Sequence, residues 1–148
     1  MSRYFYPVLV RVEALQPYRL RTTWSTGEVL EIDVEAVLRR HVALAPILAP
    51  DVFSQVHVGE GGSSVEWIDE EFGADNVHAW AREQAGDASH QMFDAWMARN
   101  GLSLSGAAEA LGISRRMVSY YRTAHKRIPR QTWLACLGWE VWRGSAVA

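Results

Sequence analysis

The sequence predicts an α+β fold: a small antiparallel-sheet N-terminal domain followed by an all-α helix-turn-helix domain. Three patterns predict it: alternating side chains near the N-terminus, apolar residues at helical spacing near the C-terminus, and a change of charge between the halves. Residues 1–85 contain seven Lys or Arg and 13 Asp or Glu, a net of −6, and residues 86–148 contain eight and four, a net of +4, which together give the net −2 of the 148-residue chain. The predicted boundary is Gly86–Ser89, which gives predicted domains at residues 1–86 and 87–148.

The N-terminal sheet is predicted from residues 5–34. The predicted strands are Val8–Glu13, Tyr18–Trp24 and Glu28–Val34. Each run alternates with a period of two, and Ser25–Gly27 is a hairpin signal between the second and the third. In the third run Leu30, Ile32 and Val34 share one side and acidic residues share the other. One face is therefore expected to pack and the other to be wet, as in an antiparallel meander.

The rest of this half is predicted to be a mixture of short elements. They are a helix at Glu35–His41, an irregular apolar stretch at Leu44–Ala49, a single turn at Asp51–Phe53, strands at Gln55–Val58 and Val65–Ile68, and a helix at Asp75–Ala85. Pro46 and Pro50 interrupt the apolar stretch, and Gly59–Ser64 is interpreted as a loose hairpin loop. The last helix is amphipathic and is expected to cover the sheet or to bridge to the next domain.

Two short helices joined by a tight turn are predicted within Leu104–Tyr121. Gly112 ends the first helix, because only Gly enters the left-handed region there without a Cβ clash. Ser114 is the predicted N-cap of the second helix. Ala108 is small enough for a close helix crossing, and Val118 fills the angle between the helices. This spacing is typical of a DNA-binding helix-turn-helix.

The outward face of the second helix is basic. Arg115 and Arg116 lie in its first turn, where side chains reach base edges in the major groove, and Arg reads guanine through two hydrogen bonds. From Arg115 to Arg130 the sequence has six Lys or Arg and no acid. A structural hairpin with merely solvated charges is the alternative, which this acid-free run disfavours. The predicted DNA-binding residues are Ser114, Arg115, Arg116, Ser119, Tyr120, Arg122, Lys126, Arg127 and Arg130.

Residues 89–143 resemble the helix-turn-helix domain of the phage lambda repressor and Cro class, also called Xre-like. The resemblance implies a leading helix at His90–Asn100 and a following helix at Arg130–Trp142. The implied core residues are Phe93, Trp96 and Met97 in the leading helix, and Leu134, Leu137 and Val141 in the following one. The resemblance also implies base contacts from Arg115, Arg116 and Tyr120. Tyr120 departs from the shorter polar residues usual there, so contact with a phosphate or a thymine methyl is the alternative.

Residues 6–80 resemble a small uncharacterised bacterial α+β domain family. The matching motif residues are Tyr18, Leu20, Trp24, Gly27, Asp33, Val34, Val65 and Trp67. Such domains occur alone, in neighbourhoods that suggest toxin–antitoxin pairs, and fused ahead of helix-turn-helix domains. The resemblance implies architecture more than activity.

Nothing in the composition calls for catalysis, a metal or a cofactor. The five His have no metal-ligand spacing, and Asp69–Glu71 is interpreted as a solvated turn rather than a cation site. The single Cys136 excludes an intrachain disulfide and is expected to be a buried thiol. No run has the length of a membrane span and no apolar signal region follows Arg3, so we expect a cytoplasmic protein that is not an enzyme.

Two functions remain open from the sequence. The first is a sequence-specific transcriptional regulator that binds double-stranded DNA as a homodimer, because one motif alone covers too few base pairs for specificity. The alternative is an antitoxin or protein-interaction module whose N-terminal domain binds a toxin-like partner. Trp139 and Trp142 in the last helix are equally compatible with a dimer contact and with the intrachain core.

Overall fold

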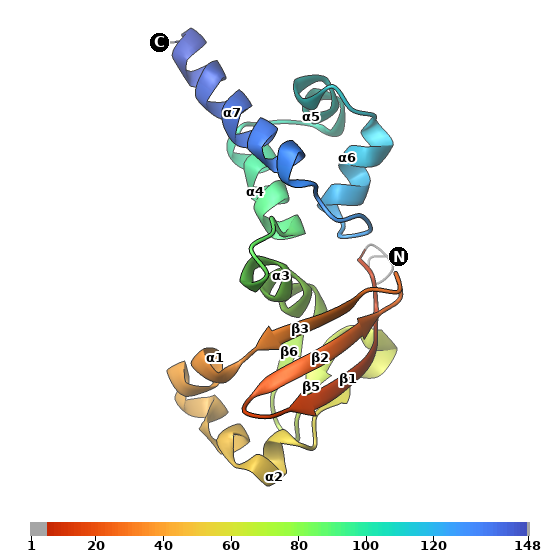
Figure 1. Ribbon diagram of the computed structural model, residues 1–148, viewed down its shortest axis with the longest axis vertical. Helices are drawn as coiled ribbons and strands as arrows, with labels where there is room; N and C mark the ends of the chain where they lie inside the picture. The colour runs from red at the N-terminus through yellow and green to blue at the C-terminus, as the bar shows by residue number, and fades with distance from the viewer. Residues whose placement is uncertain (1–5, 148) are drawn as a thin grey trace. The chain divides into compact units, whose positions relative to one another are not determined.

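The computed structural model describes residues 6–147, so Phe5, at the start of the predicted sheet region, lies outside the described residues. The chain divides into two compact units, residues 1–85 and 86–148, which we call the sheet unit and the helical unit (Figure 1). Antiparallel strands with short helices form the first, and the described part of the second is all helical. The predicted α+β fold class is therefore confirmed.

The sheet unit contains two three-stranded antiparallel sheets. Its elements are β1 (Leu9–Leu15), β2 (Arg19–Trp24), β3 (Val29–Asp33), α1 (Glu35–Arg40), the 3-10 helix η2 (Val42–Leu48), α2 (Pro50–Phe53), β4 (His57–Val58), the 3-10 turn η3 (Glu60–Gly62), β5 (Ser64–Glu66), β6 (Glu71–Gly73) and α3 (Ala74–Gln84). The order β1-β2-β3 is the predicted meander, and β4-β5-β6 forms the second sheet. The interpretation of Asp69–Glu71 as a solvated turn is wrong at its last residue, which begins β6. Glu71 pairs with Glu66 of β5 because the next residue, Phe72, pairs with Val65 and is buried, which holds this segment in the sheet.

The first sheet follows its sequence pattern except at one position. In β3, Ile32 is buried while its neighbours Glu31 and Asp33 are exposed, as the alternation predicts. In β1 a register shift between Leu9 and Arg11 marks a bulge. A bulge inserts an unpaired residue and breaks the two-residue period, so the consecutive residues Val10 and Arg11 are both exposed, Val10 by 60%.

The family-like motif residues of this unit are mostly core residues. Leu20, Trp24, Val34, Val65 and Trp67 are all buried in one hydrophobic cluster. Helix α3 closes this core by packing against β3, β5 and β6. The motif is therefore explained by packing, which agrees with its structural interpretation.

A buried polar cluster lies beside this core. His78 on α3 is 4% exposed, with Nε2 3.1 Å from Oε1 of Glu28 and its ring edge-on to Trp24 at a centroid distance of 4.8 Å. Glu28 also forms an ion pair with Arg82, so its charge is shared between two partners. Burial lowers the pKa of His78 to about 4, so the imidazole is neutral at pH 7.

The helical unit is built from four helices around an aromatic core. They are α4 (His90–Arg99), α5 (Leu104–Leu111), α6 (Arg115–Arg122) and α7 (Arg130–Val147). Phe93, Trp96 and Met97 on α4 are buried, as predicted. The ring centroids of Trp96 and Trp139 are 5.8 Å apart, and Nε1 of Trp96 donates to the carbonyl oxygen of Cys136 at 2.8 Å. A side chain of α4 thus fixes the position of α7.

The predicted inward face of α7 is wrong. Leu134, Leu137 and Val141 are exposed, by 56%, 38% and 70%. The buried residue of this helix is Cys136, flanked by the half-buried Trp133 and Trp139, all of which pack on the aromatic core. Both sides of α7 are apolar in sequence, and the core selects the side whose large rings fill it. Of the two Trp residues left open, Trp139 is in the core and Trp142 is 66% exposed.

None of the helices in residues 6–147 is both long enough and apolar enough to span a membrane.

Candidate nucleic-acid interface

The turn between α5 and α6 has the geometry that Gly112 was expected to supply. Gly112 adopts φ 68° and ψ 34°, and the N–H groups of Gly112 and Ile113 both donate to the carbonyl oxygen of Ala108. A Cβ at Gly112 would meet nothing within 4 Å, so backbone conformation alone requires glycine here. Ser114 then caps α6 by accepting the N–H of Met117 at 3.0 Å.

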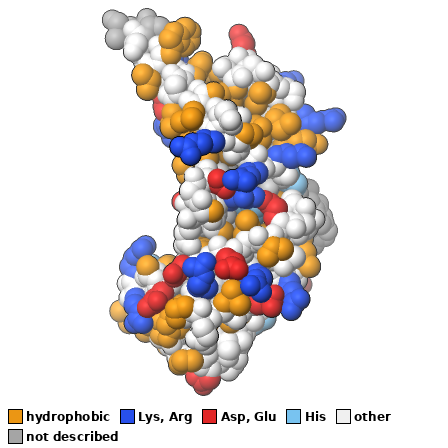
Figure 2. Space-filling view, in the orientation of Figure 1, with side chains coloured by type: hydrophobic (Ala, Val, Ile, Leu, Met, Phe, Trp, Pro, Cys, Tyr) orange, Lys and Arg blue, Asp and Glu red, His pale blue; other side chains and the backbone are white. Residues whose placement is uncertain are grey.

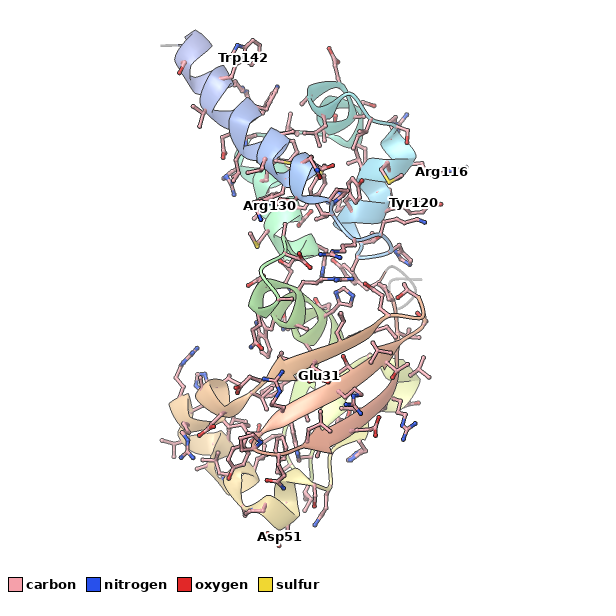
Figure 3. The ribbon with its side chains drawn as sticks, viewed as in Figure 1. Glu31, Asp51, Arg116, Tyr120, Arg130 and Trp142 are labelled. Atoms are coloured by element: carbon pink, nitrogen blue, oxygen red, sulfur yellow. The ribbon has the colours of Figure 1, made fainter. Side chains whose placement is uncertain are left out.

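Helix α6 has one buried and one open side. Val118 and Tyr121 are buried against the aromatic core, with the Tyr121 ring 5.8 Å from that of Phe93. Arg115 and Arg116 occupy the first two helical positions and are exposed. Figure 3 shows Arg116 and Tyr120 projecting away from the body of the helical unit, and in Figure 2 Lys and Arg side chains gather on this side.

Stability does not account for the two arginines. A helix N-terminus carries partial positive charge, and cations there typically cost about 0.3–1 kcal/mol. Neither Arg115 nor Arg116 forms an ion pair with any described residue that would offset this. The pair is therefore placed where it disfavours the isolated helix and where an external anion or base edge can reach it.

Tyr120 supports a third cation. Its ring is half-buried, and Nζ of Lys126 lies 6.0 Å from the ring centroid. The Tyr120 carbonyl oxygen also accepts the N–H groups of His125 and Lys126, at 2.9 and 3.3 Å, which closes the loop after α6. Lys126 is thereby held beside the C-terminal end of the helix, while its own surface stays exposed.

Two of the predicted DNA-binding arginines are already paired with acids. Nε of Arg122 donates to Oδ1 of Asp94 at 2.7 Å, and a terminal nitrogen of Arg127 donates to Oδ1 of Asp87 at 2.9 Å. Asp94 lies on α4 and Asp87 just before it, so the run from Arg115 to Arg130 is acid-free in sequence but not in space. No local pattern could have shown these carboxylates, because they lie 28 and 40 residues from their partners.

The remaining candidates are placed less distinctly. Ser119 is half-buried, and its carbonyl oxygen accepts the hydroxyl of Thr123 at 2.8 Å. Arg130 is exposed at the first residue of α7 and, together with Arg127 and Trp133, lines a hollow of about 450 Å³. Among the predicted DNA-binding residues, the exposed cations without an ion pair to described residues are thus Arg115, Arg116, Lys126 and Arg130.

Within residues 6–147, no three His, Cys, Asp or Glu side chains converge in a way that could hold a metal ion.

Comparison with known proteins assigns the sheet unit. A family model described as "Protein of unknown function (DUF2442)" matches residues 9–83. The chain belongs to the DUF2442 family. The matched span overlaps the residues whose motifs resemble an uncharacterised α+β family, and it ends within α3, before the helical unit begins.

One solved structure resembles nearly the whole chain. It is a crystal structure described as that of a putative DNA binding protein from Nitrosomonas europaea. The two chains are 70% identical, the likeness covers 95% of this chain and 90% of the other, and the TM-score is 0.87. A search of the curated proteins found no match.

Proposed function

We propose that this DUF2442 protein is a sequence-specific DNA-binding transcriptional regulator that acts as a dimer on double-stranded DNA. The helical unit serves as its helix-turn-helix domain, of the lambda repressor and Cro class. The observation that carries the proposal is the exposed pair Arg115 and Arg116, in the first turn of a capped helix whose other side is buried. The description of the 70% identical protein as a putative DNA binding protein supports the same function.

The cations divide into two roles by their place on the helix. Arg115 and Arg116 lie at the N-terminal end of α6, which in such motifs enters the major groove and contacts base edges. Lys126 and Arg130 follow the helix, where the chain would lie beside the sugar–phosphate backbone. The acidic sheet unit, with its net charge of −6, would be repelled by phosphate, so the helical unit carries the contact. The proposed activity is binding without catalysis.

The experiment is a comparison of specific and random DNA. Selection from a random pool of duplexes first yields the consensus site, which we expect to be palindromic. Arg115→Ala and Arg116→Ala are then expected to cost about 1–3 kcal/mol on that site and little on a scrambled duplex. Lys126→Ala is expected to weaken binding to both duplexes alike. It should also reduce the slope of log K against log salt concentration by about 0.9, the value for one lost phosphate contact.

Unfolding must be excluded as a cause. These side chains are on the surface, so each variant should keep the melting temperature of the wild type. Equal losses on both duplexes for Arg115→Ala and Arg116→Ala would mean that α6 only grips phosphate, which contradicts sequence-specific reading. Selection that enriches no sequence would contradict the proposed function as a whole.

A further inference from the structure

Helix α7 carries an exposed apolar stripe, formed by Leu134, Leu137, Val141 and Trp142. These residues are 56%, 38%, 70% and 66% exposed, and they are four of the eight large hydrophobic residues exposed in the described part of the chain. They recur at i, i+3, i+7 and i+8, which places them on one side of the helix. In Figure 2 hydrophobic side chains lie along this helix, and Figure 3 shows Trp142 near its C-terminal end.

The fold of the helical unit does not use this stripe. Trp133, Cys136 and Trp139 occupy the opposite side and pack on the core. Two of the three charged side chains of α7 contact the C-terminal end of α4, and the third, Arg130, is exposed one turn before Leu134, at the start of the same face. Glu140 pairs with Arg99 at 2.7 Å, and Arg143 donates to the carbonyl oxygen of Asn100 at 2.8 Å. Between Gln131 and Trp142, therefore, no described charged side chain lies on the stripe.

The size of the stripe is what an interface centre requires. From their exposed fractions, the four residues leave on the order of 450 Å² of mostly apolar surface exposed, within the range of about 300–600 Å² of the largest apolar patch on a typical monomer, which is often functional. A standard interface buries about 800 Å² per partner, so the stripe would form the apolar centre, roughly half, of one. Gly138 lies within the stripe, and a Cβ there would meet nothing within 4 Å, so a second helix can approach the backbone closely.

We propose that the stripe is the homodimer interface, with α7 packed against α7 of a second copy about a two-fold axis. A two-fold axis brings identical residues opposite one another, so charged side chains on such a face would repel their own copies. An uncharged apolar face satisfies this condition, and it lacks the charge that would select a partner of different composition. The pairing of two α6 helices on DNA rests on the proposed function, whereas the dimer surface rests only on the exposed residues of α7.

Sedimentation velocity of the full chain without DNA tests the surface. The wild type is expected to be a dimer at micromolar concentration, while Val141→Glu and Leu134→Glu are expected to be monomers with self-association weakened at least about 10-fold. Val42→Glu is the matched control, because Val42 is 93% exposed in the sheet unit, and it should stay dimeric. Val141→Ser, which adds no charge, should weaken the dimer less, and it keeps the test valid if a Glu variant melts early.

The outcomes separate the surface from the function. A monomeric wild type, or dimeric Glu variants with wild-type melting temperatures, would overturn the inference. Loss of the dimer in Val42→Glu as well would do the same. A dimeric wild type whose stripe variants are monomers, but which selects no DNA sequence, would uphold the interface and remove the proposed function.

Discussion

Asp94→Asn should increase the affinity of the protein for random DNA. In the structure Asp94 holds Arg122 through a 2.7 Å hydrogen bond, and their side chains are 49% and 40% exposed. An ion pair this exposed contributes about 0.2–1 kcal/mol, and a phosphate must displace it to reach Arg122. Because 1.36 kcal/mol corresponds to a factor of ten, releasing Arg122 should tighten binding by about 1.4- to 5-fold. One additional phosphate contact should also steepen the salt dependence by about 0.9 in log–log slope.

Fluorescence anisotropy on a scrambled duplex, at several salt concentrations, measures both quantities. Asp51→Asn is the control, since Asp51 is an exposed acid in the sheet unit and its loss changes net charge equally. A double-mutant cycle completes the design: Asp94→Asn should have no effect in an Arg122→Ala background. Weaker binding by Asp94→Asn, or an equal gain in Asp51→Asn, would refute competition between the carboxylate and DNA phosphate.

Three further predictions concern stability and reactivity. Gly112→Ala should destabilise the helical unit by about 1–2 kcal/mol in chemical denaturation, because φ is 68° there, whereas Gly144→Ala in α7 should not destabilise it. Cys136 should resist thiol reagents until the protein unfolds, since burial raises the pKa of its thiol to about 12. Above about pH 9 the thiol of the unfolded chain loses its proton while that of the folded chain keeps it, so the free energy of unfolding should fall as the pH rises further. The sheet unit should lose stability between pH 6.5 and 4, the window in which unfolded but not folded His78 binds a proton, and His78→Gln should flatten that dependence.

Local chemistry explains why much of the fold could be predicted. The left-handed corner at Gly112, the cap at Ser114 and the alternation of β3 each depend on a few consecutive residues, so their patterns are visible in sequence. The bulge beside Val10 is different, because it results from pairing with β2 and has no signature in β1 alone.

Tertiary choices account for what could not be predicted. The orientation of α7 depends on which of two apolar sides fills the space around Trp96, and a rotation of one residue exchanges Leu134 for Trp133. Likewise, the acids that pair with Arg122 and Arg127 come from residues far along the chain. In each case the missing information is the position of a second element, which no periodicity contains.

Helix α4 contacts both α6, the proposed DNA-binding helix, and α7, the proposed dimer helix. Through Asp94 and Phe93 it contacts α6, and through Trp96 and Arg99 it contacts α7. In the proposed dimer α4 therefore lies between the dimer surface on α7 and the DNA-contacting helix α6, and it sets the distance between the two α6 helices. That distance must match about 34 Å, one turn of B-DNA, or a multiple of it. The spacing of the two DNA half-sites would then depend on how the rings of Phe93 and Trp139 pack around Trp96, which itself contacts no base.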